Sequence, residues 1–108
     1  MSEKRYDKLV RDRIPEIIAS GGNRCRWRVL EADAYQKQVD AKLSEELAEY
    51  LEAGDVSELA DLLEVVYAAA EARGLSAGEL DAIRQHKAQE RGAFTRRILL
   101  ETVTETEA

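Results

Sequence analysis

The stretches ADAYQKQVDAKLSEELAEYLEA (residues 32–53) and VSELADLLEVVYAAAEAR (residues 56–73) decide the predicted fold of this protein. In both stretches apolar residues recur at spacings of three and four, which predicts two amphipathic helices. Gly54 ends the first helix, and Asp55 with Glu58 three residues later is typical of the start of the second. Because the turn between them is short, the two helices are expected to form an antiparallel hairpin.

The spacing also predicts which face of each helix is buried. On the first helix Glu46 falls on the apolar stripe, with Glu49 beside it, whereas Glu45 and Glu52 are expected to point toward solvent. That stripe consists of Val39, Leu43, Leu47, Tyr50 and Leu51. The second helix has an obvious core face and a second line of acidic and small residues, also expected to be buried. The core face is Leu59, Leu62, Leu63 and Val66, and the second line is Glu58, Asp61, Val65, Ala68 and Ala72.

The rest of the chain adds shorter elements to this hairpin. A short helix is predicted from about Arg11 or Pro15 to Ala19, and residues 24–30 are either a short strand or an extended arm. Ser76 with Glu79 opens a further helix that runs to about Arg91. Residues 94–100 are either helical or extended. We therefore predict one all-α domain over residues 1–100 and a polar C-terminal tail over residues 101–108.

Composition narrows the classes of function. The chain has 108 residues and a formal net charge of −6, which argues against a nucleic-acid-binding protein. No apolar run approaches the roughly 20 residues that cross a bilayer, and the N-terminus lacks an apolar signal segment. A single cysteine, Cys25, and a single histidine, His86 in a polar run, make a zinc site implausible. These features predict a cytoplasmic protein with no membrane partner.

The acidic residues on the two helices are predicted to converge. Glu46 and Glu49 precede the turn by roughly 12 and 8 Å of helix, and Glu58 and Asp61 follow it by roughly 5 and 9 Å. In an antiparallel hairpin all four lie at a similar height, where carboxylates repel unless a cation lies among them. Oxygen ligands alone favour Mg²⁺, or else Mn²⁺. The alternative is a solvated acidic flank, with Glu58 serving only as a capping residue.

These motifs resemble those of a known enzyme superfamily. The segment Lys42-Leu-Ser-Glu-Glu-Leu-Ala-Glu-Tyr50, followed by Glu58-Leu-Ala-Asp61, resembles the MazG-type all-α NTP pyrophosphohydrolases, which include MazG, dimeric dUTPases and phosphoribosyl-ATP pyrophosphohydrolases. The blocks at residues 6–18 and 87–94 are similar to a small subgroup of that superfamily. The resemblance spans most of residues 6–100.

The resemblance implies an activity and a set of roles. It implies cleavage of a nucleoside triphosphate between the α and β phosphates, giving a monophosphate and pyrophosphate. It implies Glu46, Glu49, Glu58 and Asp61 as ligands of Mg²⁺. Glu45, with Glu46 and Glu49, is implied as catalytic, either by aiding a metal-bound water or by binding a second ion. No Walker-type phosphate loop is present, and metal chemistry makes one unnecessary.

Phosphate oxygens that the metal does not hold require cationic donors. The candidates for substrate binding form two blocks, Lys8, Arg11 and Arg13 near the start and Lys87 and Arg91 on one face of the last helix. Trp27 and Tyr35 are explained more readily by core packing than by stacking on a base.

A single chain has too few long helices to surround the cleft in which the acidic residues converge. We therefore predict a homodimer or homotetramer that completes a four-helix-type bundle, as in the superfamily. Nucleotide-pool house-cleaning is the leading functional hypothesis. The alternatives are phosphoribosyl-ATP pyrophosphohydrolysis in histidine synthesis and a non-enzymatic helical interaction module.

Overall fold

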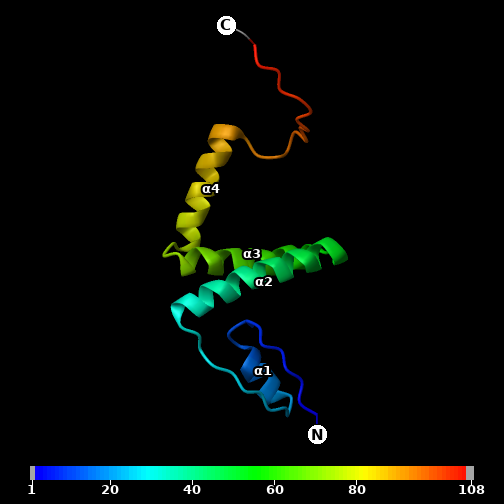
Figure 1. Cartoon of the computed structure of the whole chain (residues 1–108), viewed down its shortest axis with the longest axis vertical. Helices are drawn as coiled ribbons and strands as arrows, with labels where there is room; N and C mark the ends of the chain where they lie inside the picture. Colours follow the sequence, from blue (N-terminus) through cyan, green and yellow to red (C-terminus); the bar gives the residue numbers. More distant parts are fainter. Residues whose placement is uncertain (1, 107–108) are drawn as a thin grey trace.

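Four α-helices and the irregular segments that join them make up residues 2–106, which the computed structural model describes (Figure 1). They are α1 (Ile14–Ser20), α2 (Ala32–Ala53), α3 (Val56–Ala72) and α4 (Ala77–Arg91). Because these residues contain no strand, the all-α prediction is confirmed. Residues 24–30 form an extended arm, and no strand lies beside them to hydrogen-bond with. Met1 and residues 107–108, the outer ends of the predicted domain and tail, lie outside the described residues.

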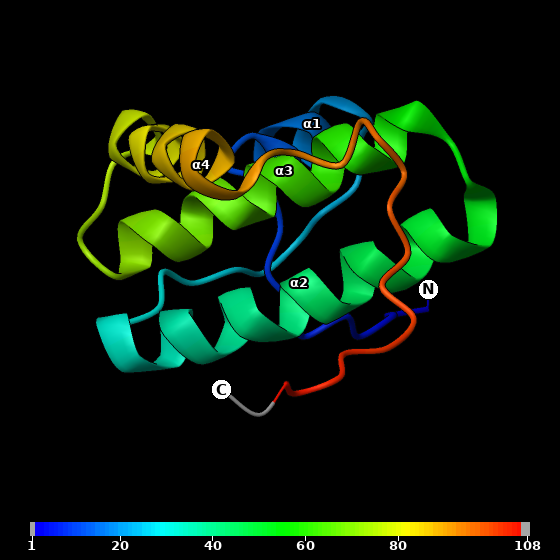
Figure 2. The same ribbon diagram turned by 90° about the horizontal axis from the view of Figure 1, so that it is seen from above.

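α2 and α3 pack side by side in opposite directions and form the predicted hairpin (Figure 2). Gly54 makes the turn possible because its φ of 67° lies in the left-handed region, where a side chain would be strained. Its backbone N–H donates to the Tyr50 carbonyl at 2.8 Å, which satisfies the end of α2. The Asp55 carboxylate then accepts from the Ser57 backbone N–H at 3.1 Å and starts α3.

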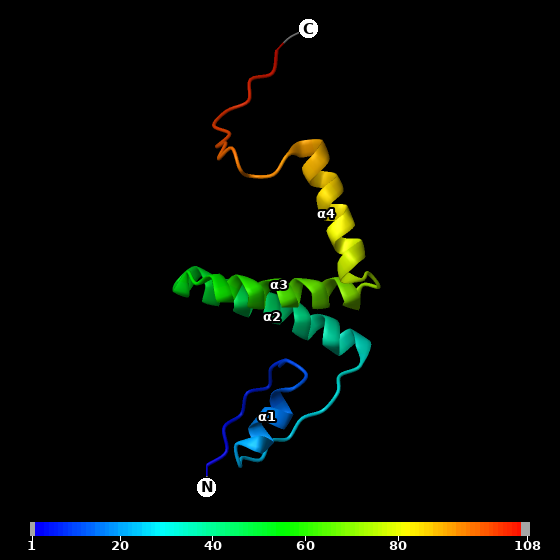
Figure 3. The same ribbon diagram turned by 180° about the vertical axis from the view of Figure 1, so that it is seen from behind.

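α4 extends away from the hairpin. It contacts α3 near the connection between the two helices and then projects to one side, while α1 and the N-terminal residues lie on the other side (Figure 3). Within the described residues α1 packs against no other helix. Residues 94–100 form a single turn and no helix, with Phe94 almost fully exposed. None of the four helices combines the length and apolar character that crossing a bilayer requires.

The start of α4 is held by the predicted capping box. Ser76 Oγ accepts from the Glu79 backbone N–H at 3.1 Å, and the Ser76 backbone N–H donates to the Glu79 carboxylate at 3.0 Å. We expect Ser76→Ala to destabilise the protein by about 1 kcal/mol, because a backbone donor of the first turn loses its partner. Thermal unfolding of the variant, compared with Ser57→Ala, whose side chain caps no helix, measures this loss. Equal melting temperatures of the two variants would contradict it.

The same box predicts a local acid sensitivity. The hydrogen bonds from the Ser76 backbone and side chain lower the pKa of Glu79 from its ordinary value of 4.5. A carboxyl whose pKa falls on folding adds stability above its unfolded pKa and loses it as the pH falls through the folded pKa. We expect Glu79→Gln to be less stable than wild type at pH 7. That difference in melting temperature should shrink below pH 4.5. A difference that stays constant down to pH 3 would count against the ionised box.

A single chain buries few of its apolar side chains. Among residues 2–106 the only apolar side chains that are fully or nearly fully buried are Val39 and Ala70. The radius of gyration is 19.4 Å and the extents are 73 × 31 × 22 Å. A compact chain of this length has a radius of gyration of about 13 Å. The single chain therefore does not close a four-helix bundle by itself.

The inward face of the hairpin agrees with the prediction only in part. The predicted core residues Leu47, Leu51, Leu59 and Leu63 are 46, 71, 42 and 48% exposed. Leu62 and Val66 are half-buried, and so is the line of Glu58, Asp61, Val65, Ala68 and Ala72, as expected. Small side chains on this line let α3 approach α2 closely, so the leucines near the turn face outward. Core packing of Trp27 is also wrong for the single chain: its arm lies on the surface and leaves it 66% exposed.

Candidate metal centre

Five carboxylates gather where α2 and α3 face each other near the Gly54 turn. Oxygen atoms of Glu45, Glu46 and Glu49 lie within 4.8 Å of one another, and so do those of Glu46, Glu58 and Asp61. We call these five residues the acidic cluster. Glu46 belongs to both groups and therefore joins the acids of one helix to those of the other. This juxtaposition follows from the antiparallel hairpin, which sets residues before and after the turn at one height.

Glu46 is the most deeply placed member. The residue is only 7% exposed, and its Oε2 atom is buried without a hydrogen-bond partner. Glu58 Oε2 is likewise buried and unpartnered. A buried carboxylate oxygen without a partner is costly, because it has lost its water and gained nothing in return. The two unpartnered oxygens therefore favour a bound cation between the helices. Because all the available ligand atoms are oxygens, a hard divalent cation suits them best.

Three cations surround the cluster. Lys8 Nζ lies 3.1 Å from Glu45 Oε1, and Arg11 Nη2 lies 2.7 Å from Asp61 Oδ1. Lys42 Nζ lies 3.3 Å from carboxylate oxygens of both Glu45 and Glu46. Five acidic groups against three basic ones leave a negative excess at this end of the hairpin.

The pKa shifts follow from these neighbours. Burial acts to raise the pKa of Glu45, but hydrogen bonds from Lys8 and Lys42 outweigh it and lower the pKa below 4.5. The hydrogen bond to Glu45 raises the pKa of Lys8. The negative charge of Glu46 is the main cause of a raised pKa at Glu49. Glu45 is thus a stabilised anion, whereas Glu49 bears the repulsion within the cluster.

The prediction for Glu45 is corrected, and the alternative for Glu58 does not hold. Glu45 does not point into solvent; it is half-buried because Lys8 and Lys42 draw it toward the hairpin. Glu58 is not simply a capping residue, since Asp55 caps α3 through Ser57 and the Glu58 side chain turns toward Glu46 and Asp61.

Lys42 is the site residue that the sequence prediction did not assign. Its side chain is 17% exposed, and its ammonium group bridges two acids of the cluster. The signal was present, because Lys42 stands three and four residues before Glu45 and Glu46, the spacing of side chains that meet on one helix face.

The remaining predicted substrate-binding residues lie elsewhere in the single chain. Arg13 pairs with Glu16 at 3.5 Å on the surface of α1. Lys87 and Arg91 lie on the part of α4 that projects away from the hairpin (Figure 1). His86, from the polar run, is exposed, and its Nε2 lies 2.9 Å from Glu90 Oε1.

A hollow of about 90 Å³ opens onto the acidic cluster. It is bounded by the N-terminal segment on one side and by the hairpin on the other. Its lining residues are Leu9, Val10, Arg11, Lys42, Glu46, Asp61, Glu64 and Val65.

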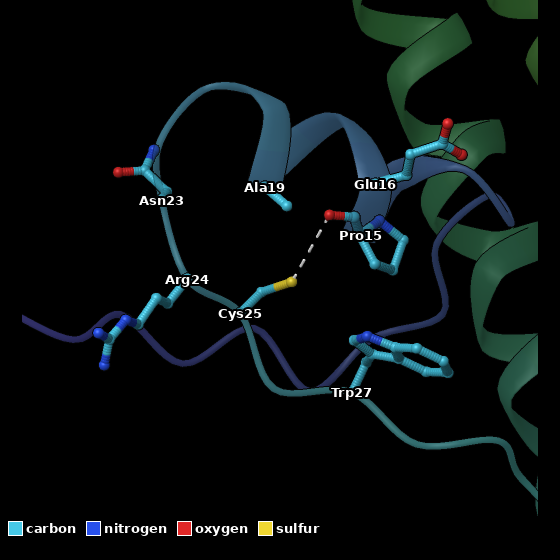
Figure 4. A pocket seen from close by; sticks show the side chains of 7 residues that line it. All are labelled: Pro15, Glu16, Ala19, Asn23, Arg24, Cys25 and Trp27. Carbon is cyan, nitrogen blue, oxygen red and sulfur yellow. Dashed lines mark hydrogen bonds between the residues drawn. The ribbon is translucent and has the colours of Figure 1, made fainter.

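A second hollow, of about 550 Å³, is wide but holds no comparable group of acids. It lies between α1 and the extended arm, where Cys25 Sγ donates to the Pro15 carbonyl at 3.9 Å (Figure 4). The Glu16 carboxylate points away from Cys25, and the Trp27 ring lies below Pro15 at the edge of the hollow (Figure 4). The candidate site is therefore the hollow at the hairpin.

Comparison with known proteins does not extend this picture to an activity. No family model and no solved structure match the chain. A curated protein of Mycolicibacterium smegmatis, described as uncharacterized, is 49% identical over 53 residues. The match covers 49% of this chain and 53% of that relative, so the chain spans about half the length of the curated relative it matches.

Proposed function

We propose that this protein is a magnesium-dependent nucleotide pyrophosphohydrolase that cleaves between the α and β phosphates of a nucleoside triphosphate. The observation that carries the proposal is the buried, unpartnered carboxylate oxygen of Glu46 at the junction of two acidic groups. A helix flank that served only solubility would leave its acids in water. The motif resemblance supplies the reaction class, with nucleotide-pool house-cleaning in the cytoplasm as its setting.

The acids divide into two sets of metal ligands. Glu46, Glu58 and Asp61 offer oxygens from both helices, and Glu49 and Glu45 extend the set along α2. Mn²⁺ would fit the same oxygens as Mg²⁺. A bound ion would polarise phosphate oxygens and lower the pKa of a water molecule.

The protein's own cations complete the chemistry. Arg11 and Lys8 approach the cluster from the N-terminal segment, where a polyphosphate needs donors. Glu45, the anion that two lysines stabilise, is suited to orient a metal-bound water molecule or to bind a second ion, because its lowered pKa makes it a weak base.

We further propose that a second copy covers the exposed leucines near the turn, in a homodimer or homotetramer. The elongated shape and the sparse core support this assembly. It would also give Lys87 and Arg91 a route to the acidic cluster of the partner. Sedimentation of the purified protein measures the assembly, and a monomer at micromolar concentration would contradict it.

Pyrophosphate release from a nucleotide panel tests the activity. The panel contains canonical dNTPs, oxidised nucleotides and phosphoribosyl-ATP, each with Mg²⁺ and with excess chelator. We expect release that requires Mg²⁺ and stops on chelation. Release from phosphoribosyl-ATP alone would move the assignment to histidine synthesis. No release from any compound would favour the non-enzymatic interaction module.

A further inference from the structure

The N-terminal segment forms one wall of the metal centre through two ion pairs. Arg11 reaches Asp61 across 50 residues of sequence, and Lys8 reaches Glu45 across 37. Residues 8–11, which we call the cationic segment, have no helical structure, and only Leu9 among them is half-buried. Besides these pairs, Leu9 and Val10 line the hollow beside Val65, while α1 packs against no other helix of the described residues.

These ion pairs are weak enough for a divalent ion to replace Lys8 and Arg11 as the partner of the carboxylates. The side chains of Lys8 and Glu45 are 44 and 30% exposed, and those of Arg11 and Asp61 are 58 and 42% exposed. Exposed pairs contribute little net stability, because water screens them and ordering long side chains costs entropy. A divalent ion held by several carboxylates interacts more strongly with Asp61 than one guanidinium does.

The two kinds of cation also compete for the same place. Arg11 occupies Asp61 Oδ1 at 2.7 Å, and Asp61 belongs to the group that Glu46 and Glu58 complete. An ion among these oxygens would lie next to the guanidinium, and like charges at that distance repel strongly. The same argument applies to Lys8 at Glu45 in the neighbouring group.

We propose that Lys8 and Arg11 are exchangeable counter-ions of the acidic cluster, so that binding of a divalent cation releases the cationic segment from the hairpin. This inference rests on the proposed function, since it assumes that the cluster binds metal. Release opens the wall of the hollow and frees two phosphate-binding cations only when metal is present. The segment thus couples entry of the metal ion to opening of the site.

Mg²⁺ binding without nucleotide, measured by calorimetry on the full chain, gives the first readout. We expect Arg11→Ala and Lys8→Ala each to tighten binding by about threefold, because the metal no longer has to displace a competing cation. Arg13→Ala is the matched control: among the described residues Arg13 pairs with Glu16 and with no acid of the cluster, so this substitution should leave the Mg²⁺ affinity unchanged.

Limited digestion with trypsin gives the second readout and needs no substitution. Saturating Mg²⁺ should accelerate cleavage after Lys8 and Arg11, because release from Glu45 and Asp61 leaves both side chains free to enter the protease. Slower or unchanged cleavage, or unchanged Mg²⁺ affinity in both alanine variants, would overturn the counter-ion exchange while leaving the metal site intact. If the wild type does not bind Mg²⁺ saturably, both the proposed counter-ion exchange and the proposed function are wrong.

Discussion

Glu49→Gln is expected to remove magnesium-dependent pyrophosphate release and leave the fold intact. Groups that only support a metal ligand already cost 10- to 100-fold when mutated, so loss of a ligand should cost about 100-fold or more. The fold should survive, because Glu49 is exposed and its carboxylate is repelled by Glu46. Removing the charge of Glu49 relieves this repulsion and introduces no new unfavourable contact.

Turnover of purified Glu49→Gln, with Mg²⁺ and the best nucleotide of the panel, measures this effect. Glu52→Gln is the matched control, since Glu52 is an exposed acid on α2 that belongs to neither ligand group. Circular dichroism and thermal unfolding report whether the helices persist. Equal turnover in Glu49→Gln and Glu52→Gln would show that Glu49 is not a residue of the active site.

Glu46→Gln is expected to abolish stabilisation by Mg²⁺. A ligand at 100 times its dissociation constant stabilises the native state by about 2.7 kcal/mol. Because Glu46 is shared by both groups, its substitution should remove that gain, whereas loss of a residue from only one group would remove part of it. Without metal the variant should be at least as stable as wild type, because glutamine removes one of several mutually repelling charges and Lys42 keeps its hydrogen bond to Glu45.

Melting temperatures with and without Mg²⁺ measure both effects. In a domain of this size a change of 1 kcal/mol corresponds to roughly 4–8 °C. Glu71→Gln serves as control, since Glu71 is an exposed acid on α3 outside the cluster, and it should keep the full Mg²⁺ shift. A Glu46→Gln protein that Mg²⁺ stabilises as much as wild type would show that the ion binds elsewhere.

Some residues of the acidic cluster could be predicted from the sequence because their positions depend on local geometry. Helical spacing put Glu46 on the inward side of α2, and the short turn at Gly54 set Glu58 and Asp61 opposite it. The same local rules predicted the capping box at Ser76. No such rule reaches Lys8 and Arg11, whose contacts with the cluster span 37 and 50 residues.

The sequence by itself determined the helices, their ends and the height of the acids, because hydrogen bonds within each helix and turn fix these features. Only the tertiary structure decided how much of each face of α3 is covered. Periodicity predicted that both faces are buried, yet Leu59 and Leu63 remain exposed in the single chain while Leu62 and the line of small residues after Asp61 are half-buried, because small side chains allow close packing against α2. Tertiary structure also placed Lys8 and Arg11 beside Glu45 and Asp61. Attraction between charges far apart in the sequence leaves no pattern in local residue spacing.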